Sequence, residues 1–145
     1  MKDFMNYKIG NIKAILLFAF LFIGSTLFAQ DRIYDNDFDT KIHEKSPFDD
    51  EGHSIIVVEV WAEFNKDNAF KDWSKLKGIT HYYRCDIATS PAIKKKYRIR
   101  MAPTIMVFSD GVLWESFKAG LDLECPVDLE ELQETIDEAK KANQF

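Results

Sequence analysis

The sequence predicts an α/β domain, in which helices pack against a central β-sheet. Three observations indicate this class: an apolar strand at residues 55–62, a strand, helix, strand order that begins there, and an amphipathic helix near the C-terminus. The run Ile-Ile-Val-Val-Glu-Val-Trp-Ala at 55–62 is typical of a strand buried on both faces, at the centre of a sheet. From residue 32 the expected order of elements is βαβαβαββα.

The elements before the middle of the chain have distinct local signals. Phe70, Trp73 and Leu76 share one helical face, and Gly78 is a typical helix end. We therefore expect a short strand at 32–34, a short helix from Asp37 through Ile42, the central strand at 55–62, a helix at 65–77 and a strand at about 80–87.

The second half of the domain has stronger end signals. Ser90-Pro91 is a typical helix start, and Asp110-Gly111 predicts a tight hairpin between strands at 103–109 and 112–118. Asp128 and Glu131 form a capping box for the last helix, with Val127 and Leu132 as its hydrophobic staple. The expected buried face of that helix consists of Leu129, Leu132, Ile136 and Ala139.

Residues 1–29 have the pattern of a secretory leader. An apolar run at 14–29, 16 residues long, follows Lys2, Lys8 and Lys13. This run is shorter than the roughly 20 residues of a membrane-spanning helix. We expect cleavage after Ala29, which leaves a domain at 30–145 in the periplasm or outside the cell. The alternative is an uncleaved leader that anchors the domain to a membrane.

The mature chain is acidic. It has 116 residues, enough for one domain with its own core, and carries 16 basic against 23 acidic residues, a net charge of −7. This balance argues against nucleic acid or anionic lipid as the main partner. His43, His53 and His81 show no metal-ligand spacing with each other or with the cysteines, so neither a metal nor another cofactor is expected.

The element order and three motifs resemble the thioredoxin family over essentially the whole mature chain. The motifs are Val-Glu-Val-Trp-Ala-Glu at 58–63, Lys-Tyr-Arg-Ile-Arg-Met-Ala-Pro-Thr at 96–104 and Phe-Ser-Asp-Gly at 108–111, and residues 37–40 look like the first helix of the family. The resemblance implies a thioredoxin-like fold, with a central mixed sheet of about five strands flanked by about four helices on both faces.

The redox motif of that family is absent. Where thioredoxins carry Cys-x-x-Cys, this chain has Asn65-Lys66-Asp67-Asn68. Disulfide exchange needs a thiolate nucleophile, so we expect no catalytic residue here. Asn65 or Asp67 is expected to cap the helix that begins at this point.

The resemblance also implies a groove for an extended peptide. Pro103 matches the cis-proline of the family, and the backbone of Met101 and Ala102 would pair with the peptide. The predicted binding residues are Trp61, Phe64, Asn65, Lys66, Asp67, Asn68, Met101, Ala102 and Pro103. Glu59 matches the buried acidic residue of the family; desolvation should raise its pKa, and we expect a structural role or a partner such as a lysine or water.

The two cysteines are expected to stay unpaired within the chain. In the family topology the strand with Cys85 and the connection with Cys125 are not neighbours, and a disulfide needs Cα atoms within about 7 Å. Cys85 should be a buried apolar residue. Cys125 should be more exposed, with a pKa raised by Glu124, and an intermolecular disulfide through it stays open.

Three functions compete at this point. The first is a redox-inactive module of the cell envelope that binds a protein or peptide, as an adaptor or as a subunit of a larger complex. The second is a thiol-disulfide exchange protein that uses Cys125 or Cys85 alone. The third is a membrane-tethered subunit that keeps its leader. The oligomeric state is not predicted.

Overall fold

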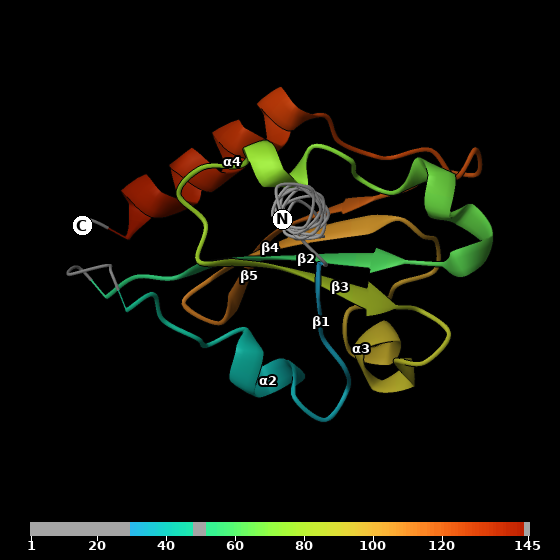
Figure 1. Cartoon of the computed structure of the whole chain (residues 1–145), viewed down its shortest axis with the longest axis horizontal. Helices are drawn as coiled ribbons and strands as arrows, with labels where there is room; N and C mark the ends of the chain where they lie inside the picture. Colours follow the sequence, from blue (N-terminus) through green and yellow to red (C-terminus); the bar gives the residue numbers. More distant parts are fainter. Residues whose placement is uncertain (1–29, 48–51, 144–145) are drawn as a thin grey trace, which may run out of the picture.

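A computed structural model describes residues 30–47 and 52–143, and its architecture is α/β (Figure 1). The predicted leader lies outside the described residues. Five strands form one mixed sheet in the order β1-β3-β2-β4-β5. The strands are β1 (Asp31–Arg32), β2 (Ile55–Trp61), β3 (His81–Asp86), β4 (Thr104–Ser109) and β5 (Val112–Lys118).

The register places the predicted central strand at the centre. β2 runs parallel to β3, which runs parallel to β1, whereas β4 pairs antiparallel with β2 and β5 antiparallel with β4. All seven residues of β2 are buried, as its apolar run predicted. Asp110 and Gly111 have φ angles of 49° and 81°, which suit the predicted two-residue turn between β4 and β5.

Helices cover both faces of the sheet. α2 (Phe38–Lys41) and α3 (Pro91–Lys96) lie on one face, and α4 (Leu129–Ala142) lies on the other, as Figure 1 shows. Two short 3₁₀ helices, η1 (Glu63–Asn68) and η2 (Trp73–Lys75), follow β2 on the side of α4. No helix within residues 30–47 and 52–143 combines the length and apolar character that crossing a membrane requires.

The predicted helix at 65–77 is wrong, because the chain breaks into η1 and η2. Ala69 is extended, with a ψ of 151°. The N–H of Phe70 donates to the buried carboxylate of Glu59 at 2.9 Å. A continuous helix would commit this N–H to a carbonyl four residues earlier. Phe70 and Leu76 are buried all the same, which explains the apolar spacing that indicated a helix.

The core has one apolar cluster on each face of the sheet. Phe38 of α2 packs edge-on against Phe108 of β4 on the first face. On the second face α4 buries Leu132, Ile136 and Ala139, as predicted, with Leu129 packed at the margin. Asp128 accepts the N–H of Glu131 at 2.9 Å, the predicted cap of this helix.

The start of α3 differs from the prediction. Ser90 makes no side-chain cap hydrogen bond. The carboxylate of Asp35 takes this role, because it accepts the N–H groups of Ala92 and Ile93 at 2.9 and 3.0 Å. An acceptor from the loop between β1 and α2 thus satisfies the free N–H groups of the helix start.

Candidate functional site

The segment that replaces the redox motif, residues 65–68, lies at one end of the sheet. It belongs to η1, which begins two residues after the end of β2 at Trp61. β4 is antiparallel to β2, with Val60 opposite Thr104, so the start of β4 lies at the same end. The Ala102–Pro103 peptide bond that precedes β4 is cis, as predicted. The fold therefore brings the 65–68 segment next to the loop that contains Pro103.

Two asparagine side chains join these parts. Asn65 Nδ2 donates to the carbonyl oxygens of Ala102 and Leu123, both at 2.8 Å. Asn68 Nδ2 donates to Asn65 Oδ1 and to the Leu123 carbonyl oxygen, both at 2.9 Å. Three segments that are distant in sequence are thereby held together. We call this arrangement the asparagine junction: Asn65, Asn68 and the carbonyl groups of Ala102 and Leu123.

The predicted capping role of Asn65 or Asp67 is wrong. The residue that precedes η1 is Ala62, and no side chain caps this helix. Asn65 points across to another loop instead of back to its own backbone. The backbone of η1 is kinked at Asn65, whose φ and ψ of −124° and 24° are not helical, and the Asn65 side chain accepts from Asn68 Nδ2 three residues later. Asn65 and Asn68 therefore act as a pair.

The backbone edge at the cis-proline is partly occupied. Ala102 is buried, and its carbonyl already accepts a hydrogen bond from Asn65. Met101 is half-buried and Pro103 is buried. A peptide that approached this edge would therefore meet Met101 first and would find one acceptor site of Ala102 in use.

Of the two aromatic residues that were predicted to bind a partner, only one is exposed. Trp61 is only 7% exposed, whereas Phe64 is 80% exposed. The guanidinium groups of Arg32 and Arg84 lie 5.5 and 5.2 Å from the centre of the Trp61 ring. Cation-π contacts of this kind stabilise the Trp61 ring, and its burial leaves little of it available to a partner.

Leu121 is a second exposed apolar residue, and it was not among the binding residues predicted from the sequence. It is 90% exposed and lies in the turn that closes with a hydrogen bond from Leu123 N–H to the Gly120 carbonyl. The turn contacts the asparagine junction through the Leu123 carbonyl. The available signal was a leucine between Gly120 and Asp122, in a turn rather than in a strand or helix.

Lys66 and Asp67 face the solvent. Lys66 Nζ lies 3.1 Å from Glu63 Oε1. This hydrogen bond and charge raise the pKa of Lys66. The two residues thus make the outer, polar side of η1, and within the described residues neither side chain forms a hydrogen bond or ion pair with the loop that contains Pro103.

Glu59 lies beneath the site, completely buried. Its Oε2 accepts hydrogen bonds from Phe70 N–H at 2.9 Å and Tyr82 O–H at 2.8 Å. Desolvation raises the pKa of Glu59, as predicted, against the opposing effects of the Arg84 charge and these hydrogen bonds. The partner is an arginine, not a lysine or water: Arg84 Nη2 lies 2.9 Å from Oε1.

The pairing of Glu59 follows from the strand register. Arg84 is the direct neighbour of Glu59 in the parallel pair of β2 and β3, so both side chains point to the same face. Tyr82 lies two residues earlier on that face of β3. The register between β2 and β3 cannot be derived from the sequence alone. For that reason the sequence did not predict Arg84 as the partner of Glu59.

The two cysteines are free thiols on opposite faces of the sheet. Cys85 is completely buried, and desolvation raises its pKa to about 11. Cys125 is half-buried and donates to the Val127 carbonyl at 3.4 Å. Burial is the main cause of its raised pKa, and the carboxylate that contributes is Glu59, not Glu124 as predicted.

Comparison with models of known protein families gave no match to this chain, and comparison with curated proteins gave no significant sequence match. Among the described residues no group of three or more His, Cys, Asp or Glu side chains could hold a metal ion. The fold thus defines an α/β domain with a five-stranded mixed sheet. The candidate site at residues 65–68 is described by its hydrogen bonds and exposed side chains alone.

Proposed function

We propose that this protein is a redox-inactive module of thioredoxin-like fold that binds a protein or an extended peptide. The strand order, the cis-proline beside the end of β2, and the position of the 65–68 segment support the fold. The leader-like sequence at 1–29 supports a place in the cell envelope, where the domain would serve as an adaptor or as a subunit of a larger complex.

The single observation that carries the proposal is the exposure of Phe64 and Leu121 at the asparagine junction. Among the large apolar side chains of the described residues these two are the most exposed, at 80% and 90%. Each is one or two residues from a member of the junction, which positions its backbone. Apolar residues held on a hydrogen-bonded frame form a surface that a partner can bury.

The apolar contribution is sufficient for a measurable affinity. Complete burial of a Phe or Leu side chain contributes about 1.5 to 3 kcal/mol. Together Phe64 and Leu121 would contribute about 3 to 6 kcal/mol before the cost of association is subtracted. Truncation of either residue should therefore weaken binding by about tenfold or more.

The test measures binding of an array of extended peptides to the purified protein. Phe64→Ser and Leu121→Ser should each reduce the signal on the peptides that bind. Val112→Ser is the matched control, because Val112 is 70% exposed but begins β5, opposite Ser109 at the far end of β4 from the candidate site. Equal binding by all variants, or loss only with Val112→Ser, would contradict the proposed site.

A second candidate function has one observation in its favour. Cys125 lines a hollow of about 350 Å³ beside Asn68, so a lone thiol lies near the position of the absent redox motif. Its raised pKa opposes this function, because thiol chemistry needs the thiolate. Maleimide labelling across a range of pH decides between the two: rapid reaction of Cys125 below pH of about 7.5 would favour the thiol enzyme.

A further inference from the structure

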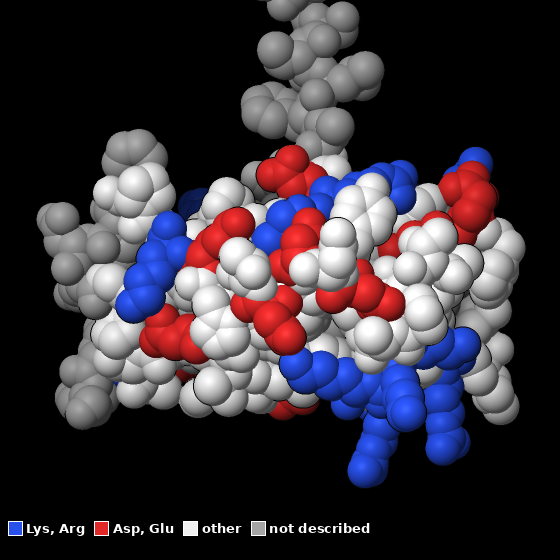
Figure 2. All heavy atoms as spheres, turned by 90° about the horizontal axis from the view of Figure 1, so that it is seen from below, with Lys and Arg blue, Asp and Glu red and all other residues white. Residues whose placement is uncertain are grey.

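Five cations gather at the end of the sheet that carries the candidate site. They are Lys94 and Lys95 of α3, Arg98 and Arg100 of the loop after it, and Lys118 of β5. We call them the basic rim. All five are exposed. Figure 2 shows cationic side chains projecting together from one end of a face that is otherwise mixed in charge.

The basic rim has no acidic partners in the part of the chain that the structure describes. The neighbouring Lys96 differs, because it forms an ion pair with Asp39 at 2.8 Å. The members of the rim form none. Five unpaired cations at one end of a chain with a net charge of −5 repel each other, and an acidic partner would remove that repulsion.

A hollow opens between the arginines and the end of β5. It measures about 390 Å³ and is lined by Arg98, Arg100, Met101, Lys118 and Ala119. Met101 and Ala119 supply apolar surface, and the other three supply positive charge. The hollow thus combines a small apolar contact with a rim of cations, which suits a polypeptide that carries both apolar and acidic side chains.

Residues that line this hollow are adjacent in the chain to residues of the candidate site. Met101 directly precedes Ala102, whose carbonyl belongs to the asparagine junction. On the other side the N–H of Ala119 donates to the Pro103 carbonyl at 3.1 Å, and Leu121 follows two residues later. A chain that covers Leu121 therefore reaches the basic rim within a few residues.

Arg98 of the basic rim lies in an unusual backbone conformation. Arg98 has a φ of 54°, in the left-handed region that favours glycine. It follows the C-terminal end of α3, where its N–H donates to the Lys95 carbonyl and the N–H of Ile99 donates to the Lys94 carbonyl. Glycine or asparagine usually occupies this position of the motif, so arginine here carries a conformational cost.

We propose that the partner of this protein is an acidic polypeptide segment. Its apolar residues cover Phe64 and Leu121, and its Asp or Glu residues lie against Arg98, Arg100 and Lys118. This inference rests on the proposed binding function and assigns the chemistry of the partner. The residues that line the hollow include no aromatic side chain, so the stacking platform typical of single-stranded nucleic acid binding is absent from it.

The test compares two fluorescent peptides of about twelve residues that share an apolar half. One peptide ends in alternating Glu and Asp, and the other ends in Gln and Asn. Fluorescence anisotropy should show about tenfold tighter binding of the acidic peptide, and about 0.5 M salt should remove this preference. Equal affinities for both peptides would overturn the inference.

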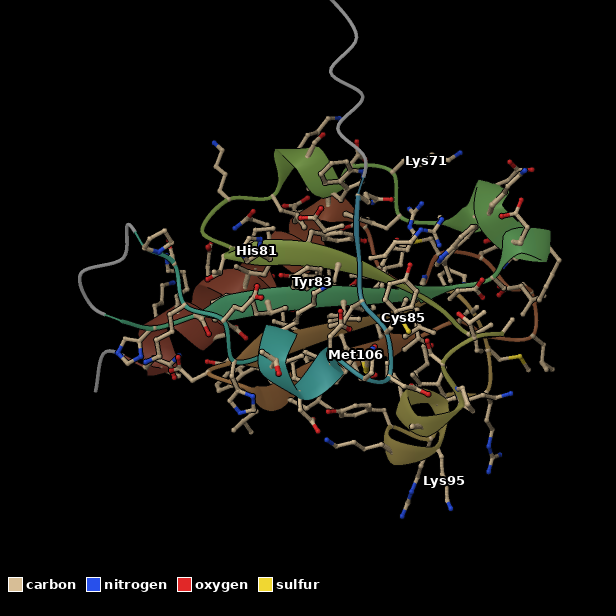
Figure 3. The ribbon with its side chains drawn as sticks, turned by 60° about the horizontal axis from the view of Figure 1, so that its bottom comes forward. Lys71, His81, Tyr83, Cys85, Lys95 and Met106 are labelled. Carbon is tan, nitrogen blue, oxygen red and sulfur yellow. The ribbon has the colours of Figure 1, made fainter. Side chains whose placement is uncertain are left out.

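Charge-reversed variants locate the preference. Arg100→Glu with Lys118→Glu should abolish it. Lys141→Glu is a control for surface charge, because Lys141 is exposed and belongs to α4, on the other face of the sheet from α3, whose Lys95 is labelled in Figure 3. Arg98→Gly should weaken the preference without lowering the unfolding midpoint, since glycine suits the backbone there. A preference that survives in the double variant overturns the inference.

The remaining outcomes separate this inference from the proposed function. If the neutral peptide binds in a Phe64-dependent manner and acidic residues add nothing, the binding function stands and the inference fails. If neither peptide binds, both fail. If anionic vesicles or single-stranded DNA displace the acidic peptide and bind more tightly through the same rim, the assignment of an acidic polypeptide is overturned.

Discussion

Replacement of Asn65 by alanine is the most direct test of the asparagine junction. The substitution removes the two hydrogen bonds that Nδ2 donates to Ala102 and Leu123 and the one that Oδ1 accepts from Asn68. The Leu123 carbonyl keeps its hydrogen bond from Asn68. The Ala102 carbonyl, in a buried residue, loses the side-chain donor that it has in the native protein.

The expected loss of stability follows from these contacts. A typical hydrogen bond contributes about 0.5 to 1.5 kcal/mol net, and the three bonds share partners, so their effects are not fully additive. We expect Asn65→Ala to lower the free energy of unfolding by about 2 kcal/mol. Asn68→Ala removes two hydrogen bonds, but the carbonyls of Ala102 and Leu123 both keep Asn65 as a donor. We therefore expect this substitution to lower the free energy of unfolding by about 1 kcal/mol.

Urea denaturation followed by tryptophan fluorescence measures both values. Asn36→Ala is the matched control, because Asn36 is exposed and has no side-chain hydrogen bond in the described structure. The free energy of unfolding of Asn36→Ala should stay within about 0.5 kcal/mol of that of the native protein. If Asn65→Ala also stays within that range, or if Asn68→Ala costs more than Asn65→Ala, the reasoning about the junction is refuted.

Three further predictions concern the titratable groups and the absent redox motif. The raised pKa of Glu59 means that its contribution to stability is greatest below pH of about 4.5, its unfolded pKa, and falls as the pH rises through the folded pKa. The free energy of unfolding relative to Glu59→Gln should therefore decrease above that pH in denaturation experiments, and a difference that grows with pH would contradict it. At neutral pH Cys85 should resist maleimide in the folded protein and react once urea unfolds the chain, because it is buried and its pKa is about 11; rapid labelling without urea would refute this. The double substitution Asn65→Cys with Asn68→Cys should form an intramolecular disulfide under oxidised glutathione, because the two native side chains touch at 2.9 Å. Mass spectrometry that finds both new thiols free would contradict the geometry.

Several elements of the fold were predicted correctly from local sequence patterns. The apolar run of β2, the Asp110-Gly111 turn and the cap at Asp128 each depend on residues a few positions apart, and the structure confirms all three. The cis bond before Pro103 and the raised pKa of Glu59 were also predicted and are present. The cis bond was implied by the resemblance to the thioredoxin family, whereas the other features are readable from sequence because their physical causes are local or depend on burial alone.

The predicted helix at 65–77 shows where prediction from local sequence patterns fails. Its apolar spacing fits a helix, but a hydrogen bond from Phe70 N–H to Glu59, 11 residues earlier, holds the backbone extended between η1 and η2. A hydrogen bond to a buried carboxylate oxygen outweighs the modest helix propensity of this stretch. The tertiary contact therefore decided the secondary structure.

The sequence by itself determined that the redox motif is absent, that a buried strand at residues 55–61 and a hairpin at Asp110-Gly111 are present, and that Glu59 is buried. The tertiary structure alone decided what replaced the motif. Asn65 finds its acceptors 37 and 58 residues away, and the basic rim is assembled from α3, the following loop and β5. These partners depend on strand register and on the packing of loops at one end of the sheet, which no local pattern encodes.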